Sequence, residues 1–189
     1  MPSSTWVHIS KVCDLIWQYR QAKTVLDCGP GFGRWGFLVR EILDVFRGRY
    51  DLWSVSISCV EIFELYIQDH HRAIYDEIII RDALEFLRSQ PKFDLIIAGD
   101  ILEHFAKDAG KKFLDLAYKA AQMALIVCVP LGPDYPQKQT LGNKDEAHRA
   151  VWELKEFRLD SRHPQIYEFV EPIKNRPYAV ILYTKGAKK

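Results

Sequence analysis

Short apolar runs recur along the chain, separated by stretches in which apolar residues return every three to four positions. The runs are rich in valine, isoleucine and leucine, which is typical of β-strands. They predict seven strands, at residues 24–27, 53–61, 77–81, 93–99, 124–130, 166–170 and 178–184. The run at 93–99 is almost continuously apolar, which favours a strand buried on both faces of a sheet.

The intervening stretches have the spacing of amphipathic helices. They predict helices at residues 7–19, 34–46, 62–75, 82–89, 109–123 and 148–157. Strands that alternate with helices form right-handed crossovers in a parallel sheet. We therefore expect an α/β fold with a Rossmann-like, seven-stranded, mostly parallel sheet and helices on both faces.

The alternation stops after the fifth predicted strand. Residues 131–146 contain Pro133, Pro136, Gly132 and Gly142, and predict a long loop. Loops of this length are usually functional or disordered. The last two predicted strands are separated by a short connection around Asn175, which predicts a C-terminal antiparallel hairpin at the edge of the sheet.

Length, charge and cysteine content indicate the number of domains, the kind of partner and the compartment. The 189 residues fit a single domain spanning 1–189. The net charge is +1, from 26 Lys+Arg and 25 Asp+Glu, so we expect no nucleic-acid partner. No apolar stretch approaches the ~18 residues that span a membrane, and no signal-peptide pattern is visible. Four cysteines without a CxxC pair are typical of buried thiols in a reducing compartment, so we expect a cytoplasmic protein.

Glycines cluster directly after the first predicted strand. Gly31, Gly33 and Gly36 spell GxGxxG, the pattern of a NAD(P)-dependent oxidoreductase. Gly29, Gly31 and Gly33 spell GxGxG, and Asp27 precedes them. A carboxylate here would repel a pyrophosphate but attract the ammonium and sulfonium of S-adenosylmethionine. The acid therefore favours S-adenosyl-L-methionine as the cofactor, with the oxidoreductase as the alternative. A further interpretation is that the glycines serve only a tight turn.

The motifs and their order resemble those of class I S-adenosylmethionine-dependent methyltransferases. Residues 27–33 (Asp-Cys-Gly-Pro-Gly-Phe-Gly) resemble the first motif of that family, and residues 93–104 resemble its fourth. The resemblance extends over residues 24–184, and the predicted closing hairpin fits the family's final two strands. It implies the methyltransferase fold and a methyl-transfer activity.

The resemblance also implies roles for individual residues. Asp27 and the glycine loop would meet the methionine end of the cofactor. Glu61, at the end of the second strand, would hold the ribose hydroxyls. Asp82 and Ala83 would meet the adenine, and Asp100 would complete the cofactor site. Glu61 lies 34 residues after Asp27, a longer spacing than is usual in this fold.

The acceptor side is less defined, because methyl transfer chiefly requires alignment and exclusion of water. His104 follows the fourth strand and His148 follows the long loop, so both are candidate catalytic residues. Because the charge is balanced and no appended module is visible, we expect a small-molecule or glycan-type acceptor. A non-catalytic protein that only binds S-adenosylmethionine is an alternative.

Asp100, Glu103 and His104 follow the spacing i, i+3, i+4, so they would share one face of a helix that began there. Such a set could hold a hard divalent cation such as magnesium, with His148 as a further ligand. The pattern resembles an arrangement of acidic residues and histidines that binds a metal in some class I methyltransferases. Helix capping by Asp100 and packing of His104 explain the same residues without an ion, so the sequence alone favours a metal-free site.

Overall fold

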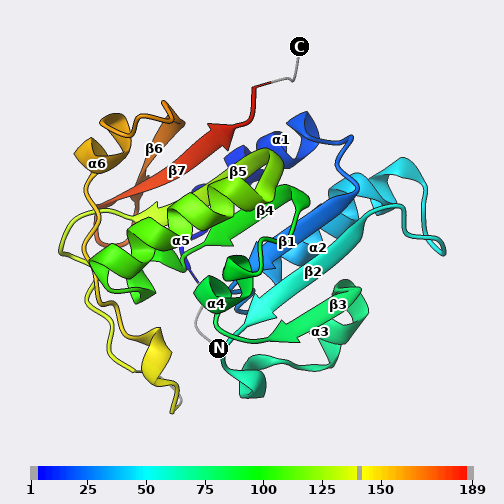
Figure 1. Ribbon diagram of the computed structural model, residues 1–189, viewed down its shortest axis with the longest axis horizontal. Coiled ribbons are helices and arrows are strands. Elements are labelled where there is room, and N and C mark those ends of the chain that lie inside the picture. Colours follow the sequence, from blue (N-terminus) through cyan, green and yellow to red (C-terminus); the bar gives the residue numbers. More distant parts are fainter. Residues whose placement is uncertain (1–3, 140–141, 187–189) are drawn as a thin grey trace.

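The computed structural model describes residues 4–139 and 142–186 and contains one seven-stranded sheet between two layers of helices (Figure 1). The order of the strands is β3-β2-β1-β4-β5-β7-β6. In chain order they are β1 (Thr24–Cys28), β2 (Ser56–Glu61), β3 (Glu77–Ile80), β4 (Phe93–Gly99), β5 (Ala121–Pro130), β6 (Gln165–Glu171) and β7 (Arg176–Thr184). The expected α/β fold is confirmed.

Strands β1 to β5 run parallel, and β7 pairs antiparallel with both β5 and β6. The expected C-terminal hairpin is therefore present. However, β7 is an interior strand between β5 and β6, so of the two hairpin strands only β6 lies at an edge.

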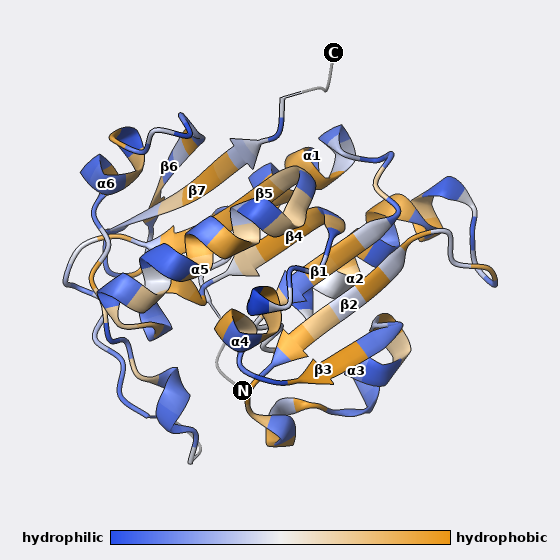
Figure 2. Cartoon of the chain, in the orientation of Figure 1, coloured by the Kyte–Doolittle hydropathy of each residue, from blue (hydrophilic) through white to orange (hydrophobic). Residues whose placement is uncertain are grey.

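The helices divide between the two faces of the sheet because successive strand residues point to opposite sides. In β4, Leu95 and Ile97 belong to one apolar cluster, whereas Ile96 and Ala98 belong to the other. The first cluster includes residues of α1 (Ile9–Gln18), α2 (Arg34–Leu43) and α3 (Asp69–Ile74). The second includes residues of α4 (Ala83–Arg88), α5 (Lys107–Ala120) and α6 (Leu154–Arg158). Figure 2 shows the apolar central strands and the mixed polarity of α5.

Most predicted helices are somewhat shorter in the structure, and two of them are only about half as long. The stretch predicted as a helix at 62–75 begins with a short 3₁₀ turn, η2 (Glu64–Tyr66), and only α3 is α-helical. The stretch at 148–157 is extended until α6 begins at Leu154. The predicted loop 131–146 is confirmed in its described part, apart from η4 (Lys144–Glu146), and residues 140 and 141 lie outside the described residues.

The extra length between β1 and β2 lies in the connection after α2. There η1 (Val45–Arg47) is followed by an irregular segment up to β2. Buried Asp44 closes this connection by accepting hydrogen bonds from the Ser54 backbone N–H (2.9 Å) and hydroxyl (2.8 Å). Arg40 also donates to Asp44, at 2.8 Å. No helix of the described residues is long and apolar enough to cross a membrane.

Candidate functional site

A pocket of about 450 Å³ opens at the carboxyl ends of β1 and β4. Order in the sheet reverses at these two strands, and ligands of doubly wound folds bind at such a point. The pocket contains eight of the ten residues expected at the site, namely Gly29, Gly31, Glu61, Asp82, Ala83, Asp100, His104 and His148. Asp27 and Gly33 are not part of its lining.

The glycine loop adopts a backbone that disfavours side chains. Gly29 and Gly31 have φ angles of 69° and 54°, in the left-handed region that glycine occupies without strain. The Gly29 N–H donates to the Val60 carbonyl at 3.0 Å, which ties the loop to the end of β2. The His71 Nε2 donates to the Gly31 carbonyl at 2.9 Å, because a carbonyl can only accept. The loop is therefore held from both β2 and α3.

Asp27 lies behind the glycine loop. It follows Leu26 in β1, so its side chain points to the face that α2 and α3 cover, and it is only 1% exposed. Its carboxylate accepts hydrogen bonds from the Tyr75 hydroxyl (2.6 Å) and the Gly36 N–H (3.1 Å). A Cβ on Gly36 would overlap the Tyr75 ring. Burial raises the pKa of Asp27 to about 6. In this structure the carboxylate fastens the start of α2, and a direct contact with a cofactor stays a prediction.

Glu61 and Asp82 stand at the ends of neighbouring strands, where the ribose and adenine were expected. Glu61 is 6% exposed and accepts a hydrogen bond from the Phe63 N–H at 2.8 Å. Burial raises its pKa to about 7. Asp82 caps α4 by accepting from the Glu85 N–H at 2.9 Å, and Ala83 begins that helix. The cap agrees with the preference of aspartate for this position, so Asp82 has a structural role whether or not it meets a ligand.

Asp100 does not begin a helix. Its φ of 52° places it in the left-handed region, and the next element is the 3₁₀ turn η3 (Leu102–His104). The expectation that Asp100, Glu103 and His104 share one helical face is therefore wrong. The Asp100 carboxylate instead accepts a hydrogen bond from the Tyr178 hydroxyl at 2.6 Å. Burial raises its pKa to about 6.

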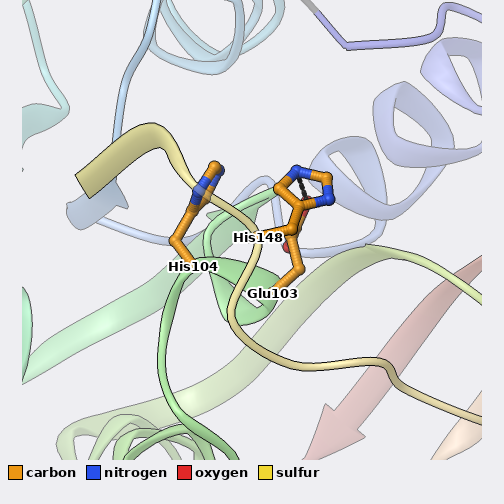
Figure 3. Close-up of side chains that lie close together, drawn as sticks. All are labelled: Glu103, His104 and His148. Atoms are coloured by element: carbon orange, nitrogen blue, oxygen red, sulfur yellow. Dashed lines mark ion pairs between the residues drawn. The ribbon is translucent and has the colours of Figure 1, made fainter. Parts of the chain in front are cut away.

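Glu103, His104 and His148 come together in the pocket beyond the end of β4 (Figure 3), whereas Glu61 and Asp82 lie at the ends of β2 and β3. One potential ligand atom from each lies within 4.8 Å of the others. Glu103 and His104 belong to η3, and His148 belongs to the segment after η4. The centroids of the two imidazole rings are 4.9 Å apart, with the rings nearly perpendicular.

The surroundings shift the pKa of each of the three side chains toward its uncharged form. Burial lowers the pKa of His104 to about 4, and it also lowers the pKa of His148. Burial raises the pKa of Glu103 well above its usual value, and the nearby Asp100 carboxylate adds to this shift. Both imidazoles are therefore neutral at physiological pH, and each has a nitrogen lone pair.

The segment that carries His148 is fastened to η3 by its backbone. The Arg149 and Ala150 N–H groups both donate to the Glu103 carbonyl, at 2.8 and 3.1 Å. The Trp152 indole donates to the Leu102 carbonyl at 3.2 Å. These bonds hold the segment against η3, and the predicted helix at 148–157 begins only at Leu154.

Several other residues of the pocket lining were hard to predict from the sequence. Ser4 and Thr5 reach the pocket because Arg34 donates to their carbonyls, at 3.0 and 2.9 Å. The position of Arg34 directly after the glycine loop was the only sign in the sequence that it lies at the site. Glu146 lines the pocket from η4, and only its place in the long loop pointed to it.

No protein-family model matches the chain, and no curated protein matches it. Among solved structures it is similar to 1,6-didemethyltoxoflavin-N1-methyltransferase of Burkholderia thailandensis, which contains bound 1,6-didemethyltoxoflavin and S-adenosylhomocysteine (TM-score 0.68, 16% identity, covering 93% of this chain and 76% of that one). It is also similar to the methyltransferase domain of bacterial CtHen1 (TM-score 0.62, 15% identity, 95% and 97% covered).

A third similar structure is an O-methyltransferase family protein of Burkholderia thailandensis (TM-score 0.59, 13% identity). The match covers 94% of this chain but 56% of that protein, so this chain spans little more than half its length. All three structures are methyltransferases by name, and two names specify different acceptor atoms. At these identities the likeness establishes the fold of class I S-adenosylmethionine-dependent methyltransferases and leaves the acceptor open.

Proposed function

We propose that this protein is an S-adenosylmethionine-dependent methyltransferase that acts on a small-molecule or glycan-type acceptor. The observation that carries the proposal is the composition of the pocket at the ends of β1 and β4. One part of it contains the glycine loop, Glu61 and Asp82, at the strand ends where this fold binds its nucleoside. The other part contains His104 and His148, where we place the acceptor.

S-adenosylmethionine supplies a methyl group that its sulfonium activates, and an acceptor lone pair displaces the neutral thioether in line. The protein therefore has to position the two molecules and exclude water. Backbone groups of Gly29 and Gly31 allow close approach of the methionine end, and the Glu61 carboxylate accepts hydrogen bonds from the ribose hydroxyls. The carboxylates of the pocket, Asp100 among them, attract a ligand that carries two positive charges.

His104 and His148 act on the acceptor side. A hydroxyl acceptor has to lose its proton as its oxygen bonds to the methyl carbon. The neutral imidazoles offer lone pairs that assist this step, by accepting that proton or by holding a cation that acidifies the hydroxyl. The segment that contains His148 also covers this part of the pocket and limits access of water.

The cofactor can be tested with the unmodified protein. S-adenosylhomocysteine is expected to raise the melting temperature, because a ligand that binds only the folded state stabilises it by about 2.7 kcal/mol at 100 times its Kd. NAD and NADP at the same concentrations are expected to leave the melting temperature unchanged. Stabilisation by NAD together with no response to S-adenosylhomocysteine would favour the oxidoreductase instead.

The role of Glu61 predicts a pH dependence. The raised pKa of about 7 belongs to the protein without ligand, and hydrogen bonding from the ribose favours the ionised carboxylate. Binding therefore releases a proton when the pH is below the pKa. Affinity for S-adenosylhomocysteine should decline as the pH falls from 8 to 6, by up to about tenfold per unit below pH 7.

Glu61→Gln is expected to weaken binding by roughly 10- to 150-fold at pH 8, since a hydrogen bond to a charged group contributes about 1.5–3 kcal/mol. It should also flatten the pH profile. Glu64→Gln, in η2 and outside the pocket lining, is the matched control and should bind like the unmodified protein. Calorimetric titration measures both effects. Equal pH profiles for Glu61→Gln and the unmodified chain would show that another group titrates.

A further inference from the structure

The side chains of Glu103, His104 and His148 converge, yet Glu103 and His148 form no hydrogen bond with each other. His148 Nδ1 lies 2.6 Å from the Tyr135 carbonyl, which can only accept, so Nδ1 carries the ring proton. The lone pair is therefore on Nε2, and Nε2 is the atom that faces Glu103 Oε1, at 3.9 Å. This distance is too long for a hydrogen bond. Glu103 Oε2 and His104 Nδ1 are also buried without a hydrogen-bond partner.

We propose that Glu103, His104 and His148 bind one divalent cation in the acceptor part of the pocket. The inference rests on the proposed function for the role of the ion, but the site itself rests on the geometry. It is the one group of three or more histidine, cysteine and acidic residues with converging ligand atoms among residues 4–139 and 142–186.

The distances fit ligands of a common ion. Zinc binds nitrogen and oxygen at about 2.0–2.2 Å, so two ligands of one ion lie roughly 3–4 Å apart. Glu103 Oε1 and His148 Nε2 are already at such a distance, 3.9 Å. The widest separation in the group, 4.8 Å, requires a movement of only about 1 Å, within the reach of side-chain rotation.

The surroundings of the two imidazoles match those of metal ligands. A histidine that binds a metal usually donates its second ring N–H to a carbonyl or carboxylate, which fixes the tautomer and the ring. Tyr135 supplies such a carbonyl to His148. Backbone hydrogen bonding from Glu146 and Ala147 likewise favours a protonated ring nitrogen on His104, and it raises the pKa of His104 against the effect of burial.

The charges around the cluster also favour a cation. Glu103 is 3% exposed and faces the carboxylates of Asp100 and Glu146, both of which also line the pocket. Two positive groups lie nearby: Arg34 lowers the pKa of Asp100, and Arg149 lowers the pKa of His104. A divalent ion at Glu103 would offset the mutual repulsion of the three carboxylates.

A catalytic dyad without a metal explains the arrangement less well. In such a dyad a carboxylate accepts the N–H of the imidazole and orients it. Here the N–H of His148 goes to Tyr135, and Glu103 faces the unprotonated nitrogen. Glu103 Oε1 and the lone pair on His148 Nε2 then face each other across 3.9 Å without a hydrogen bond, a gap that a shared cation would bridge.

The ligand types select the kind of ion. Two imidazoles and one carboxylate suit zinc, cobalt, manganese or iron(II), whereas magnesium and calcium prefer oxygen ligands alone. Three protein ligands leave coordination positions open, as in catalytic sites. There the ion would bind a hydroxyl of the acceptor and lower its pKa, so that its proton leaves to water as the oxygen takes the methyl group. We therefore infer a hydroxyl-bearing acceptor.

The test uses the full chain, freed of metal with a chelator and then dialysed. Titration with Co²⁺ is expected to give visible absorption bands that saturate at one ion per chain, and calorimetry with Zn²⁺ should give the same ratio. Glu103→Gln and His148→Gln should each weaken binding by at least about 100-fold, since even changes in supporting residues cost 10- to 100-fold. His163→Gln, an exposed histidine outside the pocket, is the matched control and should bind normally.

Binding of S-adenosylhomocysteine is measured on the same samples and shows that each variant is folded. Absence of Co²⁺ bands in a protein that binds S-adenosylhomocysteine would overturn the metal site and leave the proposed function intact. Binding of Co²⁺ that is equal in Glu103→Gln, His148→Gln and the unmodified chain would also overturn it, because the ion would then lie elsewhere. Loss of S-adenosylhomocysteine binding with normal Co²⁺ binding would contradict the proposed function instead.

Discussion

Replacing Arg40 with methionine is expected to lower the free energy of unfolding by about 3–5 kcal/mol, the range for removing one partner of a buried ion pair. Arg40 is 5% exposed and donates to Asp44 (2.8 Å), Asp76 (2.7 Å) and the Val55 carbonyl (2.8 Å). Without it, the fully buried Asp44 loses its nearest cation and the long connection between α2 and β2 loses its anchor. Urea denaturation measures the change.

Arg88→Met is the control for the loss of an arginine charge. Arg88 pairs with Glu85 on α4, and both side chains are about half exposed. Such a pair contributes less than about 1 kcal/mol. The double variant Arg40→Met with Asp44→Asn should recover part of the loss, because it removes the uncompensated charge. Equal stabilities of Arg40→Met and Arg88→Met would contradict the importance of this buried network.

Gly31→Val is expected to reduce affinity for S-adenosylhomocysteine by at least about 100-fold, a loss of 2.7 kcal/mol or more. Gly31 lines the pocket at a φ of 54°, where a β-branched residue is strongly disfavoured. A valine has to move the loop backbone or project into the space of the ligand. Calorimetry gives the affinity, and circular dichroism reports whether the fold persists.

Gly48→Val separates strain from loss of the site. Gly48 has a φ of 77° and lies in the connection after α2, where a Cβ would meet no atom within 4 Å. Valine there suffers comparable backbone strain but is remote from the pocket. It should be destabilised by about 1–3 kcal/mol and still bind S-adenosylhomocysteine. Normal binding by Gly31→Val would show that the glycine loop does not contact the ligand.

The fold was largely predictable because its signals are local. Alternation of side chains across buried strands produces continuous apolar runs such as β4, and their order with helices between them predicts the parallel sheet. The same alternation explains the placement of Asp27. As the neighbour of Leu26 and Cys28 in β1, it must face α2 and not the second layer of helices. Its partners Gly36 and Tyr75 were not predictable, since Tyr75 comes from a different crossover.

Errors occurred where distant contacts determine the backbone. Helical spacing at 148–157 predicted a helix where residues 149–152 are instead held against η3, by bonds to the carbonyls of Glu103 and Leu102. Asp100 was expected to begin a helix, but its bond to Tyr178 joins it to the last strand, 78 residues away. Sequence spacing therefore suggested a cation site with the wrong geometry. In the structure the candidate cation site consists of Glu103, His104 and His148, without Asp100. His148 comes from a separate loop.

The interior position of β7 has a consequence for how the protein is made. Ribosomes deliver β6 before β7, yet β6 pairs only with β7 in the sheet. Until residues 176–184 emerge, β6 has no neighbour and β5 presents an unpaired edge along its length. Unpaired strand edges promote aggregation. Nascent chains should therefore be most vulnerable late in synthesis, and premature termination before β7 should yield insoluble fragments.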